Sequence, residues 1–205
     1  MLVIGLTGNI AAGKSSVARH FAAWGATLVD ADLLAREAVA PRTSALRAIV
    51  ARWGSTMLAA DGSLDRGALR RIVFGDATER AALDAIVHPE VARLRAEAVA
   101  AAAARGDRLV VCDIPLLFES GLTGTVDAVV LVDAPRDQRL ARLVRDRQLA
   151  PDEAAAMMDA QWPSERKRSR ADWVIDNDGT LADLEAQSRV VFDALAARAA
   201  LAPSP

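Results

Sequence analysis

Short apolar runs, each followed by a longer stretch with helical spacing of apolar residues, form the pattern of this chain. The runs that predict strands span residues 2–6, 27–29, 109–114, 128–132 and 173–175. Residues 15–24 place their apolar positions at helical spacing, so the chain begins with a predicted strand, loop and helix. Continuous apolar strands separated by helices are typical of a parallel sheet covered on both faces. The sequence therefore predicts the α/β fold class.

Two stretches interrupt this alternation and are interpreted as insertions. Residues 33–105 have a helical pattern without an obvious strand, and they include an alanine-rich helix at 95–105. Residues 136–170 carry nine basic and six acidic side chains, a net charge of +3 in a chain whose net charge is −2. The basic side chains of this stretch could bind the negative charge of phosphate groups. Such a charged run is also typical of a solvated helix with ion pairs. Beyond Leu201 we expect a frayed end.

The composition excludes several function classes. No apolar run in the 205 residues reaches the roughly 18 residues that span a bilayer. The chain starts with a short apolar stretch that meets Gly5 at once, unlike a secretory signal, so we expect a soluble, cytoplasmic protein without a membrane partner. The net charge gives no reason to expect nucleic acid as a partner.

Cys112, the only cysteine, lies in an apolar run and is expected to be a buried, inert thiol.

A phosphate-binding motif lies between the first strand and the first helix. The string Gly8-Asn9-Ile10-Ala11-Ala12-Gly13-Lys14-Ser15 matches G-x-x-x-x-G-K-[ST] in the required context. The two glycines allow the loop to turn its amide groups toward one anion, and the helix that follows adds its positive end. Only two of the 25 basic residues are lysines, Lys14 and Lys167. We predict that Lys14, an exposed ammonium, contacts the β- and γ-phosphates of ATP and that Ser15 binds Mg²⁺.

The remaining ATP contacts are expected from the loop and the residue after it. The predicted ATP-binding residues are Gly8, Ala11, Ala12, Gly13, Lys14, Ser15 and Ser16. The motif alone does not identify an acceptor, and it does not separate a kinase from a nucleotide-driven switch.

Carboxylates follow two of the predicted strands. Asp30 and Asp32 are two residues apart, so in an extended chain both side chains would face the crevice where α/β sheets bind ligands. One of them could orient an acceptor hydroxyl and take its proton; the alternative for either is to cap the next helix. Asp113 ends the third run, where an acid that binds Mg²⁺ directly or through water is expected; a loop-capping role is the alternative.

Several strings, taken together and in order over nearly the whole chain, resemble the dephospho-coenzyme A kinase family. They are residues 5–16, 29–32 with 35–37, 61–66, 73–74, 88–89, 113–119 and 171–177. The strings 61–66 and 113–119 are far more specific than a phosphate loop. The resemblance implies transfer of the ATP γ-phosphate to the ribose 3′-hydroxyl of dephospho-coenzyme A.

The resemblance also implies a domain organisation. It implies a P-loop NTPase fold, with a nucleotide-binding core at 1–32, 106–135 and 171–205, a helical substrate domain that binds the coenzyme A moiety at 33–105, and a mobile lid at 136–170. The competing hypotheses are a kinase for another small acceptor, such as a nucleoside monophosphate, and a non-catalytic P-loop switch. The oligomeric state is left open.

Residue roles follow from the same resemblance. Asp32 is implied as the base, Arg142 as the lid arginine that stabilises the transferring phosphoryl group, and Asn177 as a neighbour of the adenine of ATP. Arg66 and His88 fall in the substrate domain and are candidate substrate contacts, as is Asp30. For His88, which precedes Pro89, a role in holding a helix start is the favoured alternative.

The chain departs from the family pattern at several positions. Asn9 and Ala11 replace commoner glycines, Ala12 replaces a commoner serine, and Met157 stands where arginine is usual. The register of the lid arginines is open, so a second one could be Arg145 or Arg147.

Overall fold

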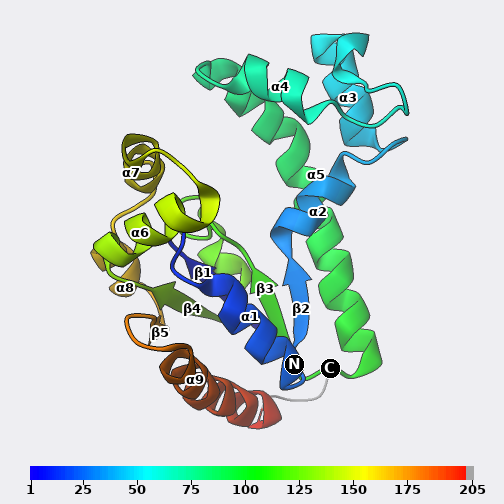
Figure 1. Ribbon diagram of the computed structural model, residues 1–205. Helices are drawn as coiled ribbons and strands as arrows, with labels where there is room; N and C mark the ends of the chain where they lie inside the picture. Colours follow the sequence, from blue (N-terminus) through cyan, green and yellow to red (C-terminus); the bar gives the residue numbers. More distant parts are fainter. Residues whose placement is uncertain (202–205) are drawn as a thin grey trace. The chain divides into compact units, whose positions relative to one another are not determined.

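A five-stranded sheet carries the phosphate loop. In the computed structural model, which describes residues 1–201, the strands are β1 (Leu2–Gly8), β2 (Thr27–Asp30), β3 (Leu109–Asp113), β4 (Ala128–Asp133) and β5 (Trp173–Asp176) (Figure 1). Their order is β2-β3-β1-β4-β5; β1 pairs in parallel with β3 and β4, and β4 pairs in parallel with β5. Every residue of β3 and β4 is buried, as expected for strands covered on both faces. The predicted α/β class is confirmed.

The described chain forms two compact units. The first contains residues 1–29 together with the chain from residue 99 onward, and the second contains residues 30–98. The helices of the first unit are α1 (Lys14–Ala23), η2 (Leu122–Thr125), α6 (Arg136–Arg147), α7 (Pro151–Asp159), α8 (Ser164–Arg168) and α9 (Leu181–Leu201). The phosphate-loop motif therefore lies entirely in the first unit.

Helices α1 and α9 pack against each other and against the sheet (Figure 1). The ring of Phe192 in α9 lies 5.6 Å from that of Phe21 in α1 and 5.4 Å from that of Trp24. These aromatic contacts join the two helices over a core formed by strand residues such as Ile4 and Ile175. They hold α1, and with it the end of the phosphate loop, in a fixed position on the sheet.

The second unit is helical. Its elements are α2 (Ala31–Ala38), α3 (Ser44–Trp53), η1 (Ser55–Met57), α4 (Arg66–Val73) and most of α5 (Ala77–Arg105). Threonine and aspartate caps begin two of them: Thr43 Oγ1 accepts from Leu46 N, and Asp65 Oδ1 accepts from Ala68 N. The second unit has a hydrophobic core of its own, and Ile49 is one of the buried residues in it. The helical pattern predicted for 33–105 is confirmed, with one isolated antiparallel bridge between Leu58 and Leu64.

Helix α5 contradicts the prediction that His88 holds a helix start. It runs without a break from Ala77 to Arg105, with Pro89 inside it. Proline removes one amide donor from a helix, and here helical residues extend for more than two turns on both sides of that position. His88 is therefore a mid-helix residue with an exposed side chain, 3.6 Å from Asp84 Oδ1.

Three further expectations concern single features. Cys112 in β3 is buried, with 1% of its surface exposed, as predicted. Within residues 1–201, no helix combines the length and the apolar character needed to cross a membrane. Residues 202–205, where a frayed end is expected, lie outside the described residues.

Candidate active site

The phosphate loop is held closely by its surroundings. Gly8 ends β1, and a Cβ atom on it would lie 2.6 Å from the carbonyl oxygen of Val132 in β4, closer than packing allows. Gly13 precedes α1 in a left-handed conformation with φ of 100°, and a Cβ there would lie 2.2 Å from Asn177 Nδ2. Both fixed glycines of the motif are thus required by conformation or close approach. Ala11 also has a positive φ, 61°, which is unusual for a residue with a side chain.

Lys14 and Asp113 form an ion pair across the loop. Lys14 is the first residue of α1, and its Nζ bonds to Oδ1 of Asp113, the last residue of β3. The lysine side chain is only 15% exposed, so the expectation of an exposed ammonium was wrong. The contact arises because β3 lies beside β1 in the sheet and both strands end at the same edge. Ser15 follows on α1 and is exposed, and Ser16 is partly buried.

Arg142 joins the loop to the end of β5. Its guanidinium donates to the carbonyl oxygens of Ala11 and Asn177, each at 3.1 Å, and to Gln138 Oε1 at 3.3 Å. Asn177 is itself buried and donates from Nδ2 to Ala12 O at 2.8 Å. Arg142 on α6 and Asn177, directly after β5, therefore contact the same part of the loop.

The other two candidate lid arginines lie elsewhere on α6. Arg145 is exposed and pairs with Asp146, and this hydrogen-bonded carboxylate raises the pKa of Arg145. Arg147 is exposed at the last position of the helix. This geometry favours Arg142 among the three for a contact with the loop.

The predicted strand geometry of Asp30 and Asp32 was wrong. Strand β2 ends at Asp30, whose Oδ1 accepts from the amides of Asp32 (2.8 Å) and Leu33 (3.1 Å) and so caps α2. Asp32 lies in the first helical turn and is exposed. A cap turns the chain from extended to helical at this point, so the two side chains do not share a strand face. The capping alternative holds for Asp30.

The sequence-predicted residues divide between the two units. Lys14, Asp113, Arg142 and Asn177 come together in the first unit. Asp30, Asp32, Arg66 and His88 belong to the second unit, in which Arg66 is an exposed residue at the start of α4.

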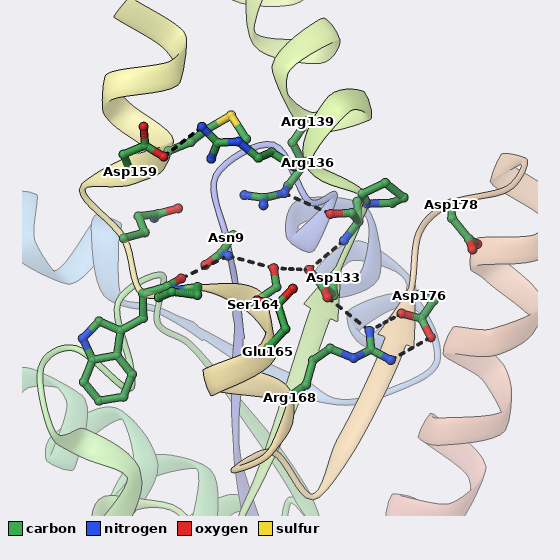
Figure 2. A pocket seen from close by; sticks show the side chains of 16 residues that line it. Asn9, Asp133, Arg136, Arg139, Asp159, Ser164, Glu165, Arg168, Asp176 and Asp178 are labelled. Atoms are coloured by element: carbon green, nitrogen blue, oxygen red, sulfur yellow. Dashed lines mark hydrogen bonds and ion pairs between the residues drawn. The ribbon is translucent and has the colours of Figure 1, made fainter.

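A cavity of about 450 Å³ lies beside the loop and was not expected from the sequence. Figure 2 shows its wall, formed by the ends of β4, α7 and β5 and by residues of α6 and α8. Arg139 lines it; its Nε donates to Ala134 O at 3.0 Å, and burial lowers the pKa of this guanidinium. Hydrogen bonds to Asp176 and Asp133 raise the pKa of Arg168 on the opposite side. The cavity is therefore rich in charge, most of it already paired.

Sequence analysis also missed a buried ion pair. Lys167 in α8 is fully buried, and its Nζ lies 2.7 Å from Oε1 of Glu119. Glu119 ends the specific string 113–119, whose first residue, Asp113, pairs with Lys14. Each of the two lysines of the chain thus pairs with one end of this string. The rarity of lysine was the signal that could have identified the second pair.

Strand order and loop define the class of protein: a protein with a P-loop nucleotide-binding fold. The crystal structure of TT1252 from Thermus thermophilus aligns with a TM-score of 0.81 at 40% identity, over 95% of this chain and 97% of that one. Dephospho-CoA kinase from Campylobacter jejuni shares the fold, with a TM-score of 0.66 at 22% identity over 94% and 96% of the two chains.

The particular family follows from sequence comparison. The model of the dephospho-CoA kinase family matches residues 2–183, and the chain belongs to this family. Dephospho-CoA kinase from Thermobifida fusca is 44% identical over 198 residues, which cover 97% of this chain and 98% of that protein. The alternatives of another small-acceptor kinase or a nucleotide switch are not favoured.

Proposed function

We propose that this chain transfers the γ-phosphate of ATP to the ribose 3′-hydroxyl of dephospho-coenzyme A, giving coenzyme A and ADP. The observation that carries the proposal is the family match over residues 2–183, which includes the phosphate loop, the end of β3 and the loop after β5. The Lys14–Asp113 pair and the Arg142 contacts at the same loop support a phosphoryl-transfer site. In the transfer, the acceptor oxygen forms a bond to the γ-phosphorus as the bond from this phosphorus to the β,γ-bridging oxygen breaks.

The loop supplies the ATP phosphate contacts in this proposal. Backbone amides of residues 11–16 and the positive end of α1 face negative charge, and the Lys14 ammonium meets the β- and γ-phosphates. Arg142 meets the charge that develops on the transferring group. Asn177, buried against Ala12 and Gly13, shapes the side of the site near the adenine.

Magnesium fits the oxygen donors at the loop. The Ser15 hydroxyl and the Asp113 carboxylate are the hard ligands that Mg²⁺ prefers, and this ion commonly completes its shell with water and substrate phosphates. Within residues 1–201 no cluster of three or more His, Cys, Asp or Glu side chains forms a preformed metal cage. When bound, Mg²⁺ would neutralise charge on the β- and γ-phosphate oxygens.

In this proposal, residues of the second unit bind the acceptor, dephospho-coenzyme A. Asp32, exposed on the first turn of α2, takes the proton of the 3′-hydroxyl as general base. Asp30 fixes that turn through its cap. Residues 33–105 form the substrate domain of the proposal, in which Arg66 and His88 contact the coenzyme A moiety. We further propose 136–170 as the lid and the cytoplasm as the location.

A coupled ADP-release assay tests this function. ATP and Mg²⁺ are held constant while dephospho-coenzyme A, adenosine monophosphate, cytidine monophosphate and shikimate are supplied in turn. Dephospho-coenzyme A should stimulate ADP release at least about a hundredfold more than any other acceptor. Equal stimulation by a nucleoside monophosphate, or none by dephospho-coenzyme A, would reject the proposal.

A further inference from the structure

The phosphate loop is hydrogen-bonded to a segment far away in the sequence. We call residues Gln161–Ser164, which follow α7 and end at the first residue of α8, the return segment. Gln161 Oε1 accepts from the backbone amide of Ile10 at 2.7 Å, across 151 positions of the chain. This contact fixes one peptide group in the first half of the loop from outside the loop.

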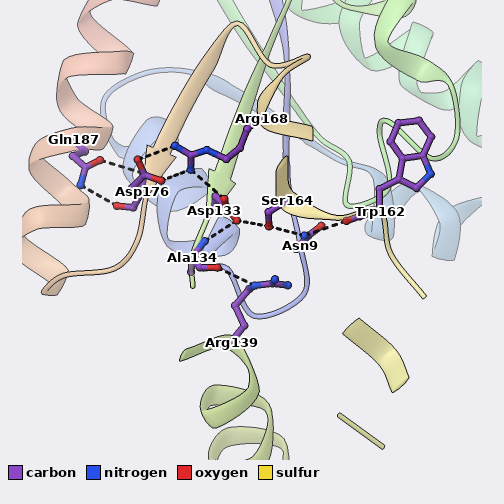
Figure 3. A network of polar contacts seen from close by, with 9 residues as sticks. All are labelled: Asn9, Asp133, Ala134, Arg139, Trp162, Ser164, Arg168, Asp176 and Gln187. Carbon is purple, nitrogen blue, oxygen red and sulfur yellow. Dashed lines mark hydrogen bonds and ion pairs between the residues drawn. The ribbon is translucent and has the colours of Figure 1, made fainter. Parts of the chain in front are cut away.

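Asn9 provides a second contact to the same segment. Its side chain is buried, and Nδ2 donates to the carbonyl oxygen of Trp162 at 3.3 Å and to Ser164 Oγ at 3.1 Å (Figure 3). A glycine, commoner at this position in the family pattern, could make neither bond. The asparagine of this chain thus joins the loop to the return segment through its own side chain.

The return segment is itself anchored on two sides. Trp162 N donates to Glu119 Oε1 at 3.0 Å, and the same oxygen pairs with the buried Lys167. Ser164 Oγ donates to Asp133 Oδ1 at 2.8 Å, at the end of β4. Figure 3 shows the second anchor continuing through Asp133 to Arg168. A segment held by the end of β4 and by Glu119, in the turn that follows β3, can hold a loop in turn.

The loop needs such support at this point. Ala11, directly after the two contacted residues, has a φ of 61°, in the left-handed region that residues with a side chain rarely adopt. Backbone in this region persists where neighbouring contacts determine it. Catalysis of phosphoryl transfer depends on amides that already point at the phosphates before the reaction starts.

We infer that Gln161 and Asn9 are positioning residues that form a latch between the return segment and the phosphate loop. The latch sets the conformation of residues 9–11 and therefore the affinity of the loop for ATP phosphates. Its importance for turnover rests on the proposed function. The latch also implies that a displacement of the return segment changes the loop.

Hydrogen exchange and ATP binding test the latch without the acceptor. Gln161→Met keeps the side-chain length and removes the acceptor, whereas Gln161→Glu keeps an acceptor oxygen. Gln148→Met is the matched control, because Gln148 is exposed at the end of α6. The readouts are exchange of the Ile10 amide in the nucleotide-free protein and the dissociation constant for ATP with Mg²⁺ by calorimetry.

The expected result is specific to one contact. Gln161→Met should speed exchange of the Ile10 amide at least about tenfold and weaken ATP binding about tenfold, the scale of one lost hydrogen bond at a partly buried group. Gln161→Glu should keep slow exchange, and Gln148→Met should match the wild type in both readouts. Slow Ile10 exchange in Gln161→Met, or wild-type ATP affinity in it, would overturn the latch.

A double variant tests whether the two residues act together. If Asn9→Ala and Gln161→Met both release the same loop, their effects on ATP binding should not multiply. The dissociation constant of the double variant should then be at most about twofold higher than that of the single variant that binds ATP more weakly. Multiplying effects would show separate roles and reject the shared latch. Because neither readout uses dephospho-coenzyme A, failure of the acceptor assay and failure of the latch are distinguishable.

Discussion

Lys167 Nζ lies 2.7 Å from Glu119 Oε1, and the lysine side chain is completely buried. The approach is not aligned as a hydrogen bond, so the attraction is mainly between the two charges. Glu119 Oε1 also accepts from Trp162 N, which ties the pair to the segment that contacts the phosphate loop. A buried pair of this kind is costly to break at one end, because the remaining charge stays in the interior.

Breaking this pair should cost stability in a non-additive way. Lys167→Met and Glu119→Gln should each lower the free energy of unfolding, Lys167→Met by about 3 kcal/mol or more, because it leaves the Glu119 carboxylate buried without its cation. The double variant should lose less than the sum of the two single losses. Urea unfolding followed by circular dichroism measures all three. Arg145→Met, which breaks the exposed pair with Asp146, is the control and should leave the free energy of unfolding nearly unchanged. Additive losses would contradict direct coupling of the two charges.

Lys14→Ala should abolish most turnover. Loss of one preorganised positive contact to the transferring phosphate should lower kcat by roughly 10² to 10⁴. Because Lys14 pairs with the buried Asp113, the variant should also lose about 1 to 2 kcal/mol of stability, in contrast to a change at an exposed lysine. Steady-state kinetics and thermal unfolding measure the two effects. Turnover within about threefold of wild type would refute the assignment of Lys14.

Arg142→Ala tests the register of the lid arginines. Removing this guanidinium should lower kcat more than it weakens ATP binding, as expected for a contact made mainly in the transition state. Arg145→Ala and Arg147→Ala are matched controls on the same helix, and both should keep kcat within about threefold. If Arg147→Ala is the damaging change and Arg142→Ala is silent, the register is wrong.

Asp32 and Asp30 should separate into a catalytic and a structural role. Asp32→Asn keeps the shape of the side chain but removes the charge that receives the proton, so kcat should fall about 10² or more with little change in ATP affinity. Asp30→Ala removes the cap of α2 and should lower stability by about 1 kcal/mol, whereas Asp30→Asn, itself a good cap, should be close to wild type in stability. A larger catalytic loss in Asp30→Asn than in Asp32→Asn would reverse the two roles.

Local sequence was sufficient for the class of fold. The five apolar runs became the five strands, because an uninterrupted run of buried residues between helices has few other stable arrangements than a covered parallel sheet. The phosphate-loop motif could also be predicted from local sequence, because its glycines are required by the backbone conformation of the loop itself. Both conclusions depend on residues that are neighbours in the chain.

Short-range patterns failed where two local effects competed. At Asp30 a strand end and a helix cap coincide, and the cap decides the direction of the side chain. At Pro89 the usual rule for a helix boundary was overcome by a long helix on both sides. Neither outcome could be predicted without knowing how the helices of the second unit pack.

By itself, the sequence determined the α/β class, the phosphate loop and the family resemblance, because each rests on residue types at fixed short spacings. Only the tertiary structure decided that Lys14 is paired with Asp113, that Arg142 rather than Arg145 contacts the loop, and that the second lysine is buried against Glu119. These contacts join residues about 50 to 130 positions apart, whose meeting depends on strand order and on how α6 and α8 return to the sheet. Charge and hydrogen-bond partners at such separations are set by packing in three dimensions, and no local pattern contains them.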